Sequence, residues 1–214
     1  MPFFSYLFPC MLYRTATPYN IDIRIVRGFD GVKVLVAGSP QSGPYIRSLW
    51  QRAFQAFGIN GNLPMRKILV LGLGGGTVIR MLLTLFPSSH IDVVEIDETM
   101  IHIARKYFGI SESGNVSIIH QDAKNFVAKA KIGTYDLVIV DIFSGRFIPE
   151  FVAEKSFGAR LRIILKTHGV LLINYLRERE YKTRSDEYAA VLRLIFLQVS
   201  EFSFANNRFF FCRK

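Results

Sequence analysis

The chain has 214 residues, of which 50% are hydrophobic and 21% charged, so it can bury a core and is not intrinsically disordered. Its two cysteines, Cys10 and Cys212, lie far apart, without a CxxC motif or a Cys/His cluster, which excludes a structural zinc site. Sparse cysteine is typical of a reducing compartment. We therefore expect a cytoplasmic protein that holds no metal.

The charge balance is basic, with 27 lysines and arginines against 17 aspartates and glutamates and a net charge of +10. Such a charge attracts polyanions but identifies no partner. The densest basic stretch, residues 160–184, is interrupted by Glu178 and Glu180 and lacks a base-stacking pattern of aromatic residues. We favour a solvated face here and keep contact with a polyanion as the alternative.

The first thirteen residues, MPFFSYLFPCMLY, are strongly apolar. They are too few to cross a membrane as a helix, and a signal peptide would need a basic start and a small-residue cleavage site, so we expect no transmembrane segment. Pro2 and Pro9 argue against a continuous helix. The segment is interpreted as a packed N-terminal strand, with a weak membrane-surface anchor as the alternative.

Residues 21–37 alternate apolar and polar side chains on both sides of a turn at Phe29-Asp30-Gly31, which predicts a β-hairpin. A loop follows at residues 38–44, and residues 45–57 place apolar side chains at helical spacing. We assign residues 1–63 to an N-terminal segment that contains this hairpin and helix.

Beyond Pro64 the pattern changes to continuous apolar runs of strand length, separated by helix-like segments. This alternation predicts parallel strands buried on both faces, because a parallel connection crosses over most compactly through a helix. Residues 197–213 form two β-rich runs around Asn206-Asn207, which predicts an antiparallel hairpin. The fold class is therefore α/β: residues 64–214 form a Rossmann-like, doubly wound, mostly parallel sheet with a C-terminal hairpin. The five apolar runs are Ile68–Leu71, Ile91–Val94, Val116–Ile119, Leu137–Val140 and Val170–Ile173.

A glycine-rich turn lies between the first of these strands and a helix, in the stretch LVLGLGGGTVIRMLLTLF. Gly72, Gly74, Gly75 and Gly76 would let the backbone turn sharply and approach a bound nucleoside at the helix N-terminus. Such turns also serve dinucleotides or simply close a tight turn. A phosphate-cradling P-loop is excluded, because there is no GxxxxGK[ST] motif.

Carboxylates follow the next three strands. Glu95 stands about 20 residues after the glycines, where a carboxylate accepts hydrogen bonds from both hydroxyls of a ribose. Nearby Asp97 is better explained as a helix cap. Asp122 and Asp141 end the third and fourth strands, each with a helix cap or solvated tip as the alternative. Together the four strand tips predict a nucleoside-binding crevice at the carboxyl edge of the sheet.

LGLGGGT, VEIDE, QDA and YDLVIVD, in this order and spacing, resemble the spermidine synthase-like, or polyamine aminopropyltransferase, family within the seven-stranded S-adenosylmethionine-dependent methyltransferase superfold. The resemblance covers roughly residues 17–213. It implies a donor of the S-adenosylmethionine or decarboxylated S-adenosylmethionine type, with Glu95 on the ribose and Asp122 on the adenine amine. Asp141 would face the reacting centre, and Gln41 and Tyr19 would line the acceptor side.

The chain departs from the family pattern at two places where the resemblance implies an aspartate, Thr77 and Ser144. The acidic residues expected in the N-terminal loop also lack counterparts in Ser42–Trp50. A dicationic acceptor needs acidic partners, because burying an unpaired ammonium costs several kcal/mol. The leading hypothesis is aminopropyl transfer to a small-molecule amine, by a protein that could form a homodimer. The alternatives are an S-adenosylmethionine-dependent methyltransferase and a non-catalytic nucleoside-binding or adapter protein.

Both candidate reactions displace a neutral thioether from a carbon attached to a sulfonium, so the enzyme chiefly aligns the nucleophile with that carbon. Asp141 is the candidate catalytic residue, because a carboxylate there could orient or deprotonate an ammonium nucleophile. Its structural alternative is to cap the turn at Ser144-Gly145.

Overall fold

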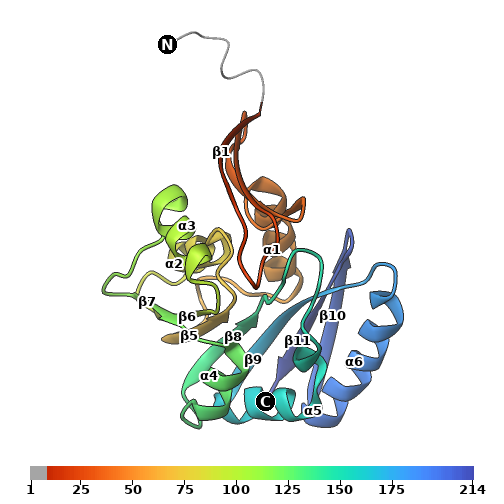
Figure 1. The fold of residues 1–214 in the computed structure, drawn as a ribbon. Coiled ribbons are helices and arrows are strands. Elements are labelled where there is room, and N and C mark those ends of the chain that lie inside the picture. Colours follow the sequence, from red (N-terminus) through yellow and green to blue (C-terminus); the bar gives the residue numbers. More distant parts are fainter. Residues whose placement is uncertain (1–8) are drawn as a thin grey trace.

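The computed structural model describes residues 9–214 and contains two sheets (Figure 1). The smaller sheet is antiparallel, with strands in the order β1-β2-β3-β4. For residues 1–8, the prediction of a packed N-terminal strand lies outside the described residues. From Cys10 onward a strand does form, but its side chains are mostly exposed rather than packed. The strands are β1 (Cys10–Thr15), β2 (Ile23–Gly28), β3 (Gly31–Val36) and β4 (Ser39–Pro40).

The larger sheet has seven strands in the order β10-β11-β9-β8-β5-β6-β7. Strands β9, β8, β5, β6 and β7 are parallel, whereas β10 and β11 form an antiparallel hairpin that joins the sheet beside β9. The predicted fold class is confirmed. The strands are β5 (Lys67–Leu71), β6 (His90–Glu95), β7 (Val116–His120), β8 (Tyr135–Val140), β9 (Leu165–Leu176), β10 (Gln198–Phe204) and β11 (Asn207–Arg213).

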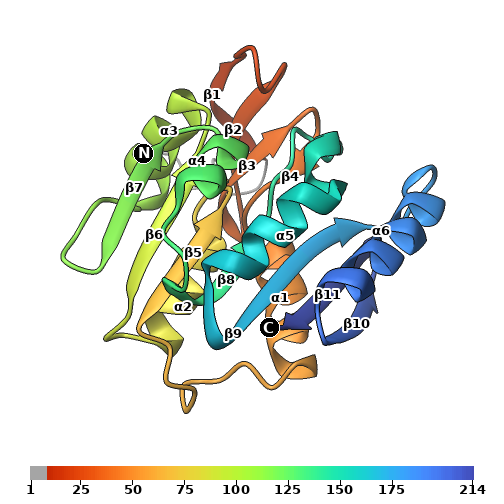
Figure 2. The same ribbon diagram turned by 90° about the horizontal axis from the view of Figure 1, so that it is seen from below.

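Helices cover both faces of this sheet (Figure 2). Strand β5 shows why: Ile68 and Val70 pack with α1, α2 and α3, while Leu69 and Leu71 pack with α4, α5 and α6. A strand that is apolar at every position can bury both faces in this way. The helices are α1 (Pro44–Ala56), α2 (Thr77–Leu85), α3 (Glu98–Phe108), α4 (Ala123–Lys129), α5 (Lys155–Ile164) and α6 (Tyr181–Ile195), with a 3₁₀ turn at Glu150–Ala153.

The N-terminal sheet shares its core with the larger sheet. Ile23, Ile25 and Val34 are fully buried in one hydrophobic cluster with Trp50 of α1 and with Phe209 of β11. The rings of Trp50 and Phe209 meet edge to face, with centroids 5.2 Å apart. The division of the chain at residue 64 stays a prediction, and the buried side chains on either side of it are continuous.

Element boundaries differ from the predicted ones where pairing extends a strand. Strand β9 begins at Leu165, five residues before the predicted apolar run, and Asn207 belongs to β11 rather than to the turn. The N-terminal hairpin gains β1 and β4 as outer strands. Among residues 9–214, no helix is both long and apolar enough to cross a membrane.

The turn from β5 into α2 depends on Gly76, which precedes the helix with φ +70°. A Cβ at this position would lie 2.2 Å from Cγ1 of Ile110, a buried residue beyond the end of α3. Gly109 also has positive φ, +62°, but a Cβ there would meet nothing within 4 Å. A comparison of alanine substitutions at Gly76 and Gly109 therefore separates the cost of backbone strain from the cost of steric overlap.

We expect Gly109→Ala to lower the free energy of unfolding by about 1–2 kcal/mol, the cost of a left-handed backbone at alanine. Gly76→Ala should cost about 1–3 kcal/mol more, because overpacking is added to the same strain. Urea unfolding of both variants measures the difference. Equal losses would show that Ile110 moves aside freely and that α2 does not depend on this contact.

Candidate functional site

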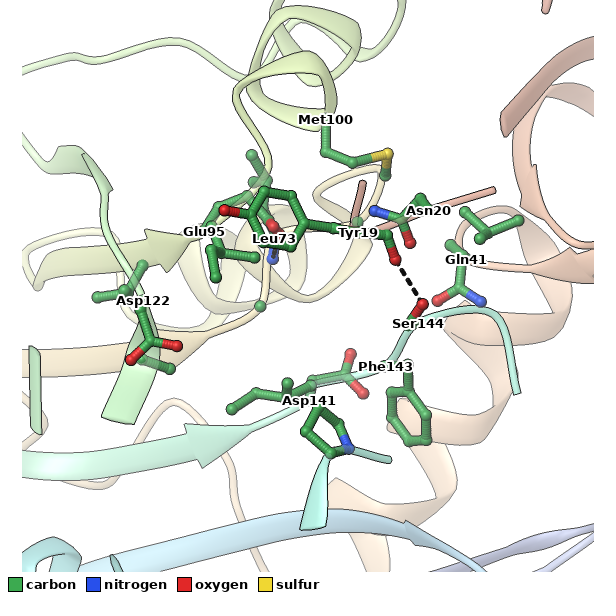
Figure 3. Close-up of a pocket in the computed structure, with 18 of the residues that line it drawn as sticks. Tyr19, Asn20, Gln41, Leu73, Glu95, Met100, Asp122, Asp141, Phe143 and Ser144 are labelled. Atoms are coloured by element: carbon green, nitrogen blue, oxygen red, sulfur yellow. Dashed lines mark hydrogen bonds between the residues drawn. The ribbon is translucent and has the colours of Figure 1, made fainter. Parts of the chain in front are cut away.

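A cavity of about 290 Å³ lies at the carboxyl edge of the parallel strands (Figure 3). The predicted residues Gly72, Gly74, Glu95, Asp122 and Asp141 all line it, at the tips of β5, β6, β7 and β8 or in the turns that follow them. The structure thus brings together residues that are up to 69 positions apart in the chain. Tyr19 and Gln41, from the N-terminal unit, line it as well, together with Asn20, Leu73, Ile96, Met100, Ile142, Phe143, Ser144, Pro149 and Phe151.

Gly72 lets the strand tips approach one another. Its φ is +98°, and a Cβ on it would lie 2.1 Å from the carbonyl oxygen of Asp141. Its amide donates to the carbonyl of Val94 at 2.9 Å, while the amide of Asp141 donates to the carbonyl of Leu71 at 2.9 Å. No side chain fits between these backbones, so glycine is required for the site to close.

Glu95 is held in a fixed orientation by backbone donors. Its Oε2 accepts from the amide of Leu73 at 2.9 Å, and its Oε1 accepts from the amide of Asp97 at 3.0 Å. Burial raises the pKa of the Glu95 carboxyl, and these two hydrogen bonds oppose the rise. Each carboxylate oxygen keeps a second acceptor position. The carboxylate can therefore accept from two neighbouring hydroxyls in the cavity.

Asp97 and Asp122 both cap helices, as the alternatives for them allowed. Asp97 accepts from the amide of Thr99 at the start of α3, and Asp122 accepts from the amide of Asn125 at the start of α4. Asp97 is buried and accepts also from Thr17 Oγ1 at 2.6 Å and from Asn20 Nδ2 at 2.7 Å, so it ties the N-terminal unit to α3. Asp122 lines the cavity, which allows its carboxylate to cap and to meet a ligand.

Asp141 is the carboxylate nearest the middle of the cavity in Figure 3. Its Oδ1 accepts from Nδ2 of Asn174 on β9 at 2.9 Å. Asn207 Nδ2 in turn donates to Asn174 Oδ1 at 2.8 Å, which fixes the Asn174 amide with its donor toward Asp141. Burial raises the pKa of Asp141 to about 6, although the bond from Asn174 lowers it. A carboxylate with this pKa can accept a proton near neutral pH.

Side chains of the N-terminal unit and of the segment after β8 meet on one side of the cavity. This side, formed by Tyr19, Asn20, Gln41 and Ser144, is called the roof. Ser144 Oγ donates to the carbonyl of Tyr19 at 2.5 Å, and Gln41 Nε2 donates to the carbonyl of Gly145 at 3.0 Å. These bonds hold Tyr19 and Gln41 over the strand tips. The hydroxyl of Ser144, which stands where the family pattern has an aspartate, therefore has a structural role in this chain.

Three expected residues lie elsewhere. A Cβ on Gly75 would meet Ser42 of the N-terminal unit at 2.4 Å, and Gly76 packs on Ile110, so both serve packing and neither lines the cavity that the described residues form. The expectation that Thr77 stands where a donor-contacting aspartate belongs is wrong. Thr77 is buried at the start of α2 and does not line this cavity. An aspartate at this position would therefore stand at a buried site rather than in the cavity.

Sequence reasoning missed Asn20 and Asn174. For Asn174 a signal existed, because it is a lone polar residue inside the apolar run of β9 and therefore needs a buried partner. Asn20 gave no comparable signal. Asn20 contributes to the site through the hydrogen bond that it donates to Asp97, which is 77 residues away in the chain.

A model of the spermine/spermidine synthase domain matches residues 50–199 of this chain. The polyamine aminopropyltransferase of Vibrio vulnificus is 34% identical over 151 residues, which are 69% of this chain and 48% of that protein. The chain thus spans about half the length of this curated relative.

Two solved structures share the fold. A spermidine synthase in complex with the transition state analogue AdoDATO superposes with a TM-score of 0.80 at 17% identity, covering 95% of this chain and 73% of that one. Human methyltransferase-like protein 13 in complex with SAH gives a TM-score of 0.63 at 28% identity, covering 72% of this chain and 74% of that one. The domain match and the curated relative establish that the chain belongs to the spermine/spermidine synthase family.

Proposed function

We propose that this chain transfers an aminopropyl group from a donor of the S-adenosylmethionine type to an amine. The observation that carries the proposal is the position of Asp141, a carboxylate with a pKa of about 6 that lines the same cavity as Glu95 and Asp122. One cavity thus offers two carboxylates for a nucleoside and a third for an ammonium nucleophile.

The donor would lie along the strand tips. Glu95 would accept from the two ribose hydroxyls, and Asp122 would accept from the exocyclic amine of adenine. The relatives crystallised with AdoDATO and with SAH support a donor of this type. Apolar side chains such as Ile96 and Ile142, which also line the cavity, would pack on the faces of the base.

In the reaction, the acceptor ammonium passes one proton to the Asp141 carboxylate. The freed nitrogen lone pair then forms a C–N bond to the carbon attached to the sulfonium, while the C–S bond breaks. The thioether leaves as a neutral group, and the positive charge ends on the alkylated ammonium. Asn174 and Asn207 would keep Asp141 oriented throughout.

Methyl transfer is the second candidate, because the roof offers no charge that would reject the carboxylate of S-adenosylmethionine. Tyr19, Asn20, Gln41 and Ser144 are all uncharged. Incubation with each donor and a panel of amines distinguishes the two reactions, since aminopropyl transfer releases methylthioadenosine and methyl transfer releases S-adenosylhomocysteine. Donor binding with neither product would favour the non-catalytic module and contradict the proposal.

Donor binding tests the role of Glu95. We expect Glu95→Gln to weaken binding of methylthioadenosine and of both donors by about tenfold or more, because a hydrogen bond to a charged group contributes roughly 1.5–3 kcal/mol. Calorimetry measures the affinities. The control is Glu98→Gln, which removes an exposed carboxylate three residues away that does not line the cavity. Similar affinities for the two variants would contradict the ribose assignment.

The pH dependence tests Asp141. A general base must be unprotonated, so kcat/KM should fall as the pH drops below about 6. Asn174→Leu removes a hydrogen bond that lowers the pKa of Asp141, so the acidic limb should move to higher pH. Methylthioadenosine affinity, which does not involve Asn174, should stay unchanged and reports on folding of the variant. An acidic limb at the same pH in both proteins would rule out Asp141 as the base.

A further inference from the structure

A second cavity, of about 320 Å³, adjoins the first and shares Gln41, Asp141 and Phe143 with it. It opens between the N-terminal unit and the tip of β9. If the donor occupies the first cavity, an amine that gives its proton to Asp141 must come from this second one. The other lining residues are Ser39, Pro40, Tyr45, Ile46, Leu49, Gly145, Arg146, Asn174, Leu176, Glu178, Asn206 and Asn207.

The walls of the second cavity suit a short alkyl chain. Ile46 and Leu49 of α1 contribute apolar surface from one element, and Leu176 contributes it from β9. Asn174 already donates one N–H to Asp141 and accepts from Asn207, so most of its amide is engaged in holding Asp141. The alkyl chain of a molecule in this cavity would therefore lie along these apolar side chains. One end of the molecule would be at Asp141, and the other at the charged residues described next.

An ion pair also lines the second cavity. Arg146 Nη2 lies 3.2 Å from Glu178 Oε1, and the Glu178 side chain is 19% exposed against 50% for Arg146. Among residues 9–214 the charged residues that line this cavity are these two and Asp141. With both carboxylates ionised, the lining carries a net charge of −1, not the −2 that would balance a dication.

We propose that the acceptor is an α-amino acid with a second, terminal amine rather than a plain diamine; this inference rests on the proposed function. The terminal ammonium would face Asp141 and take part in the C–N bond formation described above. At the other end, the α-carboxylate would meet the Arg146 guanidinium and the α-ammonium would meet Glu178. The ligand then carries a net charge of +1, which balances the cavity.

The ion pair discriminates because only the amino acid carries a counterpart for both of its groups. A guanidinium binds a carboxylate through two parallel hydrogen bonds, which are stronger than bonds between neutral groups. A diamine brings only an ammonium to this end, and Glu178 is already neutralised by Arg146. The diamine would also place its positive charge beside the guanidinium, which is repulsive.

Putrescine and ornithine form a matched pair for the test, because ornithine is the same diamine with one added carboxylate. Their binding is measured by calorimetry on the full chain saturated with methylthioadenosine. We expect ornithine to bind at least about tenfold more tightly than putrescine, the effect of one charge-assisted pair. Arg146→Gln should weaken ornithine binding by about tenfold and, because it frees Glu178, strengthen putrescine binding.

The control is Arg179→Gln, which removes the same charge from an exposed residue next to Glu178 that does not line the cavity. It should leave the preference for ornithine unchanged. Putrescine binding as tight as ornithine binding, no binding of either, or an equal loss in both variants would overturn the inference. The proposed function is judged separately, by release of methylthioadenosine from the decarboxylated donor with any amine: turnover with putrescine alone would keep that function and reject this acceptor.

Discussion

The close approach of two backbones, at Gly72 and Asp141, is the constraint on which the rest of the site depends. Strand β5 lies between β6 and β8, so the loop that leaves it touches both halves of the cavity. On one side the amide of Leu73 fixes Glu95. On the other, the lack of a Cβ at Gly72, which would lie 2.1 Å from the carbonyl oxygen of Asp141, lets Asp141 come near. The sides of the cavity proposed for the nucleoside and for the acceptor are therefore both positioned by the short segment Gly72-Leu73.

The carboxylates of Glu95 and Asp141 are supported differently, and the difference matches the roles proposed for them. Glu95 accepts from two backbone amides, which favour its charged form and oppose the rise in its pKa that burial causes. Asp141 accepts from one side-chain amide, and burial leaves its pKa at about 6. A residue that only binds benefits from a permanent charge. A residue that exchanges a proton needs both forms within reach at neutral pH.

The parallel core could be predicted from sequence because its strands are buried on both faces and appear as continuous apolar runs. The strand tips followed from that alone, since chain order places Gly72, Glu95, Asp122 and Asp141 on one edge. The packing roles of Gly75 and Gly76 could not be predicted from the sequence, because the residues they contact, Ser42 and Ile110, are more than 30 positions away. The pairing of Arg146 with Glu178 depends on tertiary structure for the same reason.

Other expectations concern properties that a single chain does not reveal. A homodimer, contact with a polyanion and a cytoplasmic location stay predictions. The basic stretch at residues 160–184 illustrates the difficulty, because several of its charges are used internally. Lys166 pairs with Asp136, and Arg160 donates to three backbone carbonyls beyond α4 or within it. Charge counted along a sequence therefore overstates the charge that is free to meet a partner.

The roof has a consequence for how ligands exchange. Within residues 9–214, its two parts, the segment after β8 and the N-terminal unit, are joined by the side-chain bonds of Ser144 and Gln41. Two such bonds contribute about 1 kcal/mol each, so a conformation with both broken would make up a few per cent of the molecules at equilibrium. Loop motions of this kind take microseconds to milliseconds, which is fast beside the roughly 10 s⁻¹ that is the median turnover of enzymes. The cavity would therefore be open to exchange of a ligand many times in the interval that a median enzyme needs for one turnover.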